Sequence, residues 1–118
     1  MRDARYCVRM IGIKEKSLWR WICKGGLPGQ WRRIEHRGTP DTVVNYKRRT
    51  FFVELKQMDR WPAEGGPIHL ELRPAQVSFF KSWRGEKYVL MRVGMELFWF
   101  DGKKRHVLPK DACSSPFA

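Results

Sequence analysis

The sequence lacks the features of secreted and membrane-spanning proteins. No apolar run approaches the ~20 residues needed to cross a bilayer, and the first residues, which include Arg2 and Arg5, form no apolar signal-peptide core. Cysteine is scarce as well, because Cys7, Cys23 and Cys113 are an odd number without a CxxC pair. This argues against a disulfide framework and against a structural zinc site. We therefore expect a cytoplasmic protein, in the host cell cytoplasm if its source is viral.

Histidine is too dispersed to suggest a metal site. The three histidines are His36, His69 and His106, and such isolated residues are more often ordinary surface or partly buried side chains than ligands. We expect the same of these three.

Acidic residues are only half as numerous as basic ones. The chain has 24 Lys and Arg against 12 Asp and Glu, which gives a formal charge of +12 and a pI near 10.2. Such an excess favours a polyanionic partner, with nucleic acid as the first candidate. An anionic membrane surface is the competitor. It is disfavoured because the basic residues are scattered rather than collected on one amphipathic helix.

The 118 residues predict one compact α/β domain, with a core at about 14–101 and a mixed sheet flanked by helices. Hydrophobic residues make up 42% of the chain, enough for a folded core. Periodicity and turn residues predict helices over 13–24 and 73–83, strands over 30–37, 42–46, 50–56, 88–93 and 96–100, and a long loop over 57–72 with a short strand over 68–72. We expect residues 103–118 to form a basic, loosely held tail.

Two short motifs carry the chemical information. Asp41 ends the run Gly-Thr-Pro-Asp at positions 38–41, thirteen positions before Glu54, and Glu54-Leu55-Lys56 ends an apolar strand. Side chains alternate along a strand, so Glu54 and Lys56 share one face. If the strand containing Asp41 pairs with this one as a hairpin, the two carboxylates can approach closely enough to share a divalent cation.

Paired carboxylates offer the hard oxygen ligands that Mg²⁺ or Mn²⁺ prefers, with positions left for water and a phosphate oxygen. Such a cation lowers the pKa of a bound water and neutralises charge on a scissile phosphate, while the ammonium of Lys56 orients the water. The plainer alternative is that Asp41 merely follows a turn and that Glu54 and Lys56 decorate an edge strand. The combination of all three in a strongly basic chain favours the catalytic interpretation.

The residues 38–41, Phe52-Val53-Glu54-Leu55-Lys56 and Arg73-Pro74-Ala75-Gln76 together resemble the VRR-NUC domain, a branch of the PD-(D/E)xK nucleases found in phages, bacteria and eukaryotes. The resemblance spans about residues 14–101. It implies a restriction-endonuclease-like PD-(D/E)xK core with a central mixed sheet. The family usually has valine between the glycine and the proline, where this chain has Thr39.

The resemblance also assigns roles to residues. It implies that Asp41, Glu54 and the backbone carbonyl of Leu55 bind Mg²⁺ or Mn²⁺ and that Lys56 is the catalytic lysine. Gln76 matches a glutamine at the start of the following helix, where it could face the active site.

The family's first acidic position lies on the N-terminal helix. Glu15 matches it by placement and would be a further metal ligand. Glu35 is a rival because it is nearer to Asp41 in sequence, although its neighbouring arginines favour a salt-bridged surface role.

Basic residues that flank the motifs are the candidates for DNA contact. Phosphate contacts from such residues position a duplex without reading its bases. Trp61 in the long loop could stack on an exposed base, or could equally pack under that loop. The basic candidates are Arg32, Arg33, Arg37, Lys47, Arg48 and Arg49.

The sequence thus predicts a Mg²⁺- or Mn²⁺-dependent endodeoxyribonuclease of the stand-alone phage type. Similar domains resemble Holliday-junction resolvases, which favours branched DNA as substrate and a homodimer as the active form. A less selective nickase of duplex DNA is the alternative within the enzyme class. Outside that class, two alternatives stay open: an inactive DNA-binding module, and a ribonucleoprotein or phage structural component.

Overall fold

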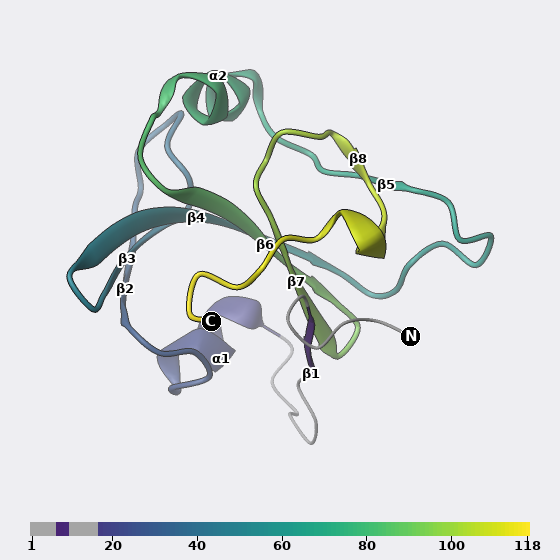
Figure 1. Cartoon of the computed structure of the whole chain (residues 1–118), viewed down its shortest axis with the longest axis horizontal. Helices are drawn as coiled ribbons and strands as arrows, with labels where there is room; N and C mark the ends of the chain where they lie inside the picture. Colours follow the sequence, from purple (N-terminus) through teal and green to yellow (C-terminus); the bar gives the residue numbers. More distant parts are fainter. Residues whose placement is uncertain (1–6, 10–16) are drawn as a thin grey trace.

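The computed structural model describes residues 7–9 and 17–118 (Figure 1). In chain order its elements are β1 (Cys7–Arg9), α1 (Leu18–Cys23), β2 (Gln30–Arg33), β3 (Thr42–Tyr46), β4 (Arg49–Met58), β5 (Ile68–His69), α2 (Pro74–Ser82), β6 (Lys87–Val93), β7 (Glu96–Phe100), β8 (His106–Val107) and a 3₁₀ turn at Pro109–Asp111. No helix within these ranges is long and apolar enough to cross a membrane.

The strands form one large mixed sheet and one small sheet. The large sheet has the order β1-β7-β6-β4-β3-β2, in which β4 and β6 run parallel and every other neighbouring pair is antiparallel. The small sheet pairs β5 with β8. The predicted α/β architecture, with a mixed sheet flanked by helices, is confirmed.

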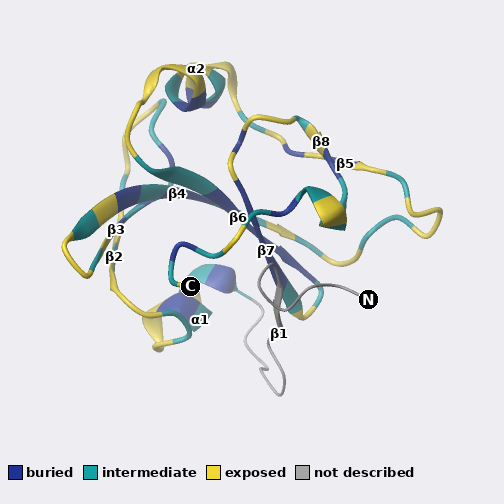
Figure 2. Cartoon of the chain, in the orientation of Figure 1, coloured by how far each residue is buried: buried dark blue, intermediate teal, exposed yellow. Residues whose placement is uncertain are grey.

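Each face of the large sheet has its own apolar core, because successive side chains on a strand point to opposite faces. On one face α2 and the β5–β8 pair cover side chains that include Val89, Met91 and Phe98. On the other face α1 packs over side chains that include Val53 and Leu90. Figure 2 shows the resulting band of buried residues along the central strands.

Local sequence signals set the helix boundaries. The side chain of Ser17 caps α1 by accepting a hydrogen bond from the backbone N–H of Arg20, and Pro74 stands in the first turn of α2, where its missing N–H leaves no hydrogen bond unmade. The predicted helix over 13–24 is seen over Leu18–Cys23, while its residues 13–16 lie outside the described residues.

The turn between β3 and β4 has a tight left-handed backbone. Tyr46 pairs with Arg49, which leaves Lys47 and Arg48 as the two turn residues, with φ values of 46° and 64°. Two-residue hairpins need this conformation to match the twist of their strands, and asparagine and glycine adopt it at less cost than lysine or arginine. The predicted polar turn is therefore present.

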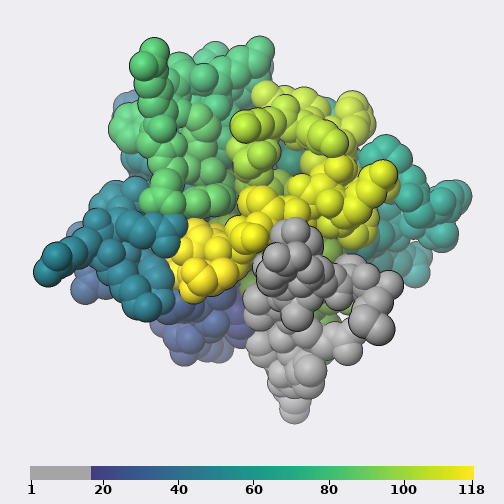
Figure 3. Space-filling model, viewed as in Figure 1, coloured from purple at the N-terminus to yellow at the C-terminus, as the bar shows by residue number. Residues whose placement is uncertain are grey.

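The chain after Gly102 is ordered, which corrects the expectation of a loosely held tail. Val107 is buried opposite Ile68 in the β5–β8 pair, and the backbone N–H of Cys113 donates a hydrogen bond to the carbonyl of Trp99. Figure 3 shows this segment, in yellow, lying across the body of the molecule. The expectation relied on the basic composition of the segment, whereas a few apolar side chains hold it in place.

Phe117 is the aromatic contact of that segment with the core. Its ring lies 4.9 Å from the ring of Tyr46, 5.7 Å from that of Phe51 and 5.8 Å from that of Trp99, measured between centroids. The side chain thus extends the core on the α1 face of the sheet.

We expect Phe117→Ala to lower the free energy of unfolding by roughly 1–3 kcal/mol, less than for a fully buried phenylalanine because Phe117 is half-buried. Urea denaturation would measure the loss, with the exposed Ser114→Ala as the matched control. Equal stability of the two variants would contradict a tail that packs on the core.

Candidate active site

The candidate site forms where β4 continues beyond its neighbour. β3 begins at Thr42, opposite Val53, whereas β4 runs on to Met58 while still paired with β6. One edge of β4 is therefore open from Glu54 onward, and Asp41 stands at the point where the chain enters β3. The predicted hairpin pairing of the two motifs is confirmed by this register.

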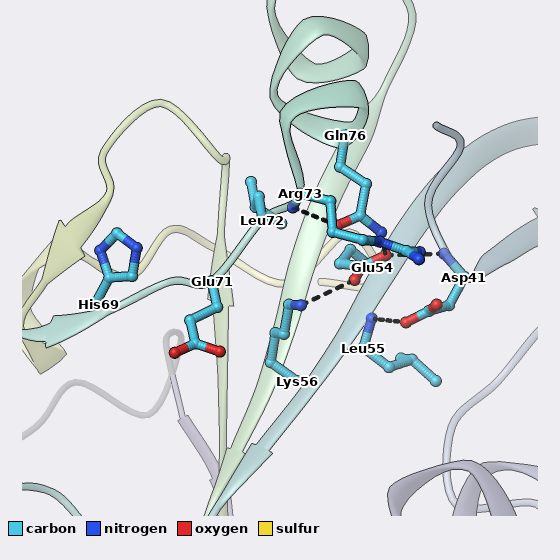
Figure 4. A pocket seen from close by; sticks show the side chains of 9 residues that line it. All are labelled: Asp41, Glu54, Leu55, Lys56, His69, Glu71, Leu72, Arg73 and Gln76. Atoms are coloured by element: carbon cyan, nitrogen blue, oxygen red, sulfur yellow. Dashed lines mark hydrogen bonds and ion pairs between the residues drawn. The ribbon is translucent and has the colours of Figure 1, made fainter. Parts of the chain in front are cut away.

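Reciprocal hydrogen bonds hold the two carboxylates side by side. The backbone N–H of Asp41 donates to Oε1 of Glu54 at 3.0 Å, and the backbone N–H of Leu55 donates to Oδ2 of Asp41 at 3.1 Å. Each carboxylate thus accepts a hydrogen bond from a backbone N–H of the neighbouring segment (Figure 4). Because the donors belong to the backbone, the positions of the two carboxylates do not depend on a flexible side chain.

Lys56 lies on the same face of β4 as Glu54, as the alternation of the strand predicts. Its Nζ is 3.1 Å from Oε2 of Glu54, and 23% of its side chain is exposed compared with 3% for Glu54. The ammonium therefore neutralises the buried carboxylate from the solvent side while it stays within reach of a bound substrate.

Gln76 connects helix α2 to the same carboxylate. It is 2% exposed, its Oε1 accepts a hydrogen bond from the backbone N–H of Arg73, and its Nε2 donates to Oε1 of Glu54 at 3.1 Å. The first bond orients the amide, and the oriented amide then supplies the donor that the buried carboxylate needs. Gln76 thus faces the site and holds Glu54 in place.

Burial and repulsion shape the protonation of this pair. The pKa of Glu54 is raised, first by desolvation in its buried position and then by the neighbouring charge of Asp41, while the charge of Lys56 opposes both. Two carboxylates this close favour the binding of a cation, because a positive charge between them relieves the repulsion.

The site opens into a cavity of about 600 Å³. Besides the five predicted residues, its walls include His69, Glu71 and Arg73 (Figure 4). These three were missed in the sequence. The signal was the alternation over 68–73, in which Ile68 and Leu70 are buried while His69, Glu71 and Arg73 are exposed on the opposite face.

The residues present fit a hard divalent cation. Asp41 and Glu54 supply two carboxylates at one point of an open cavity, which matches the preference of Mg²⁺ for one or two protein carboxylates with water and substrate in the other positions. No group of three or more acidic, histidine or cysteine side chains gathers around a metal position within residues 17–118. The chain thus provides a partial oxygen site that a phosphate would complete.

The two candidates for the first acidic position are Glu15 and Glu35. Glu15 lies outside the described residues. Glu35 is exposed just after β2 and does not line the cavity. The role of a further acidic ligand therefore stays a prediction for Glu15.

The predicted DNA contacts fall into separate groups. Arg32 and Arg33 are exposed on the edge strand β2, and Arg37 is exposed in the following loop, all near the entry to β3. Lys47 and Arg48 stand at the far end of the β3–β4 hairpin, about 20 Å from Asp41 at the usual rise of a strand.

Arg49 has a structural role instead. Its guanidinium donates to both carboxylate oxygens of Glu86, at 2.5 and 3.0 Å, and to the carbonyl of Pro116. These bonds hold the pKa of Glu86 below its usual range and tie the C-terminal segment to β4.

Trp61 packs edge-to-face on Phe98, with ring centroids 5.5 Å apart, which favours packing under the loop over base stacking.

No protein-family model matches the sequence, and no curated protein matches it either. Among solved structures the chain is similar to the Holliday junction resolvase Hjc of Archaeoglobus fulgidus, an archaeal hyperthermophile. The two are 17% identical with a TM-score of 0.49, over 71% of this chain and 74% of that chain. A likeness of this degree says nothing about activity, so the function of this chain rests on its own site residues.

The raised pKa of Glu54 predicts a pH-dependent stability in metal-free protein. The folded state holds the proton of Glu54 more tightly than the unfolded chain does, because an unperturbed glutamate has a pKa of about 4.3. The free energy of unfolding therefore falls as pH rises through the raised pKa, and the loss is complete above it.

We accordingly expect Glu54→Gln to melt above the wild type at pH 7 in EDTA, by about 4 °C for each kcal/mol recovered, and the difference to shrink toward pH 4. Scanning calorimetry across pH would measure this, with the exposed Glu64→Gln as control. A wild type that is the more stable protein at pH 7 would mean that the ion pair with Lys56 outweighs the burial.

Proposed function

We propose that the protein is a metal-dependent endodeoxyribonuclease that hydrolyses phosphodiester bonds in DNA, with a PD-(D/E)xK-type site formed by Asp41, Glu54 and Lys56. One observation carries the proposal. The carboxylates of Asp41 and Glu54 are locked together by reciprocal backbone hydrogen bonds, with the ammonium of Lys56 beside them in an open cavity.

The chemistry of the site fits a phosphodiester better than a neutral substrate. A divalent cation bound by Asp41, Glu54 and the carbonyl of Leu55 would polarise the phosphoryl group and lower the pKa of a water molecule. The formal charge of +12 draws a polyanion toward a centre that would otherwise repel it. Mg²⁺ and Mn²⁺ are the cations that this oxygen donor set favours.

Three side chains would have further roles in catalysis and substrate binding. Lys56 reaches past the buried Glu54 toward solvent, where its ammonium can orient the attacking water and stabilise charge on the phosphate. Gln76 keeps Glu54 in its position. Arg73 lines the same cavity from the segment before α2, so its guanidinium is placed to bind a phosphate oxygen of the substrate.

Branched DNA is the proposed substrate, and a homodimer the proposed active form. Both follow from the motif resemblance to VRR-NUC domains and their likeness to Holliday-junction resolvases, in which two sites meet two symmetry-related strands. The alternatives are a nickase of plain duplex and an inactive DNA-binding module. The buried carboxylate of Glu54 destabilises the fold through its desolvation and would add nothing to DNA binding, which argues against a binding module.

Cleavage of labelled DNA tests the proposal directly. We expect the wild type to cut a four-way junction with Mg²⁺ or Mn²⁺ and not with EDTA, and Lys56→Ala to lose roughly 10²–10³-fold in rate while still binding the junction. Lys81→Ala removes an exposed lysine from α2 and is the matched control. Paired symmetric incisions favour a resolvase, and plasmid nicks alone favour the nickase. Binding without any cutting would refute the nuclease.

Cation binding can be measured without substrate. We expect Mn²⁺ at about 100 times its dissociation constant to raise the free energy of unfolding of the wild type by about 2.7 kcal/mol. Asp41→Asn should lose most of this gain, since it removes one of the two carboxylate charges. An equal gain in both proteins would place the bound cation elsewhere.

A further inference from the structure

A second, smaller hollow adjoins the candidate site. It measures about 160 Å³, and Asp41, Leu55 and Lys56 line both it and the larger cavity. Its other walls come from the start of α1 and from β2, with Trp19 and Arg33 as the largest side chains. The two hollows therefore meet at the open edge of β4, with Asp41 in the wall of both.

Trp19 and Arg33 form a stacked pair on the rim of the second hollow. The guanidinium carbon of Arg33 lies 5.6 Å from the centroid of the indole ring, a cation–π contact. The side chain of Arg33 is exposed and makes no hydrogen bond or ion pair with any residue from 17 to 118, whereas Trp19 is half-buried. The arginine is thus held beside the ring but keeps its donors for a ligand.

The start of α1 is fixed against the projecting end of β4. The backbone N–H of Leu18 donates to Oε1 of Gln57 at 3.0 Å, and the side chain of Ser17 caps the helix. Gln57 is two positions beyond Leu55 on β4. The indole therefore stands at a set distance from the carboxylates, as a rigid platform requires.

An aromatic face with a neighbouring guanidinium is the combination that binds unpaired nucleotides. The ring stacks on a base of any kind, and the guanidinium binds the phosphate or extends the stack. A base inside a duplex has both faces covered by its neighbours, so only an unpaired base can use such a platform. A platform next to the carboxylates would hold the strand at a junction between paired and unpaired DNA.

We propose that Trp19 and Arg33 form a nucleotide-binding platform that receives the unpaired nucleotide next to the scissile phosphate, and so direct the site to branched or flapped DNA. The proposal rests on the nuclease function proposed above and adds the residues that choose the substrate. Arg73, which lines the larger cavity, and Arg33 here would then both contact the strand that crosses the edge of β4.

The edge strand β2 offers a matched control. Arg32 and Arg33 are adjacent and exposed and carry the same charge, but alternation places their side chains on opposite faces of the sheet. A purely electrostatic contribution would be lost equally from either arginine. A platform would be lost with Arg33 only.

The test uses a forked duplex with 2-aminopurine at the first unpaired nucleotide beside the branch, bound in Ca²⁺ so that binding is read without turnover. We expect the wild type to quench the fluorescence, Trp19→Leu to lose the quenching and bind about tenfold more weakly, and Trp19→Phe to keep most of both. Trp83→Leu removes an exposed tryptophan of the α2 side and should change neither. Arg33→Ala should weaken fork binding several-fold more than Arg32→Ala, with little difference on plain duplex.

The outcomes separate this proposal from the nuclease itself. Unchanged quenching and affinity in a folded Trp19→Leu, or equal losses for the two arginines, overturn the platform even if the wild type cuts DNA with Mg²⁺. Quenching that depends on Trp19 in a protein that cuts nothing supports the platform and refutes the nuclease. A wild type that binds the fork no better than duplex also overturns the platform.

Discussion

The buried carboxylate of Glu54 is the constraint on which the site depends. An ionised group that is 2% exposed must be hydrogen-bonded and neutralised, or it destabilises the fold. Here the backbone of Asp41, the amide of Gln76 and the ammonium of Lys56 meet this need. The same bonds join β3, α2 and β4, so the charge that weakens the fold also sets the relative positions of the elements around it.

The architecture then determines how the site is reached. β4 lies between β3, which pairs with it from Arg49 to Val53, and β6, which pairs with it from Phe52 to Met58, so that beyond Val53 its β3 side is an open edge. α1 packs against one face of the sheet, while α2 and the segment that carries His69 and Glu71 lie against the other. Both hollows open at this edge, and Asp41 lies in the wall of each.

The small β5–β8 pair and the C-terminal segment also support the site. Pairing with β8 holds β5 in place, and the residues after β5 line the wall of the cavity. Val107 is buried with Ile68 and Leu70 in the same core cluster, so β8 adds to the apolar contacts that hold the connection from β4 to α2. A segment that is basic in composition therefore contributes to the site through its few apolar residues rather than through its charge.

The sequence by itself determined the central strand and the shared face of Glu54 and Lys56, because alternation and turn residues act locally. It posed the hairpin pairing of the two motifs as a condition, which the register of β3 and β4 meets. It also indicated that Gln76 faces the site. Only the tertiary structure showed that Arg49 is bonded to Glu86 and that Trp19 lines the same hollow as Asp41. The physical reason is that these contacts join residues far apart in the chain, where composition and periodicity carry no information about which side chains meet.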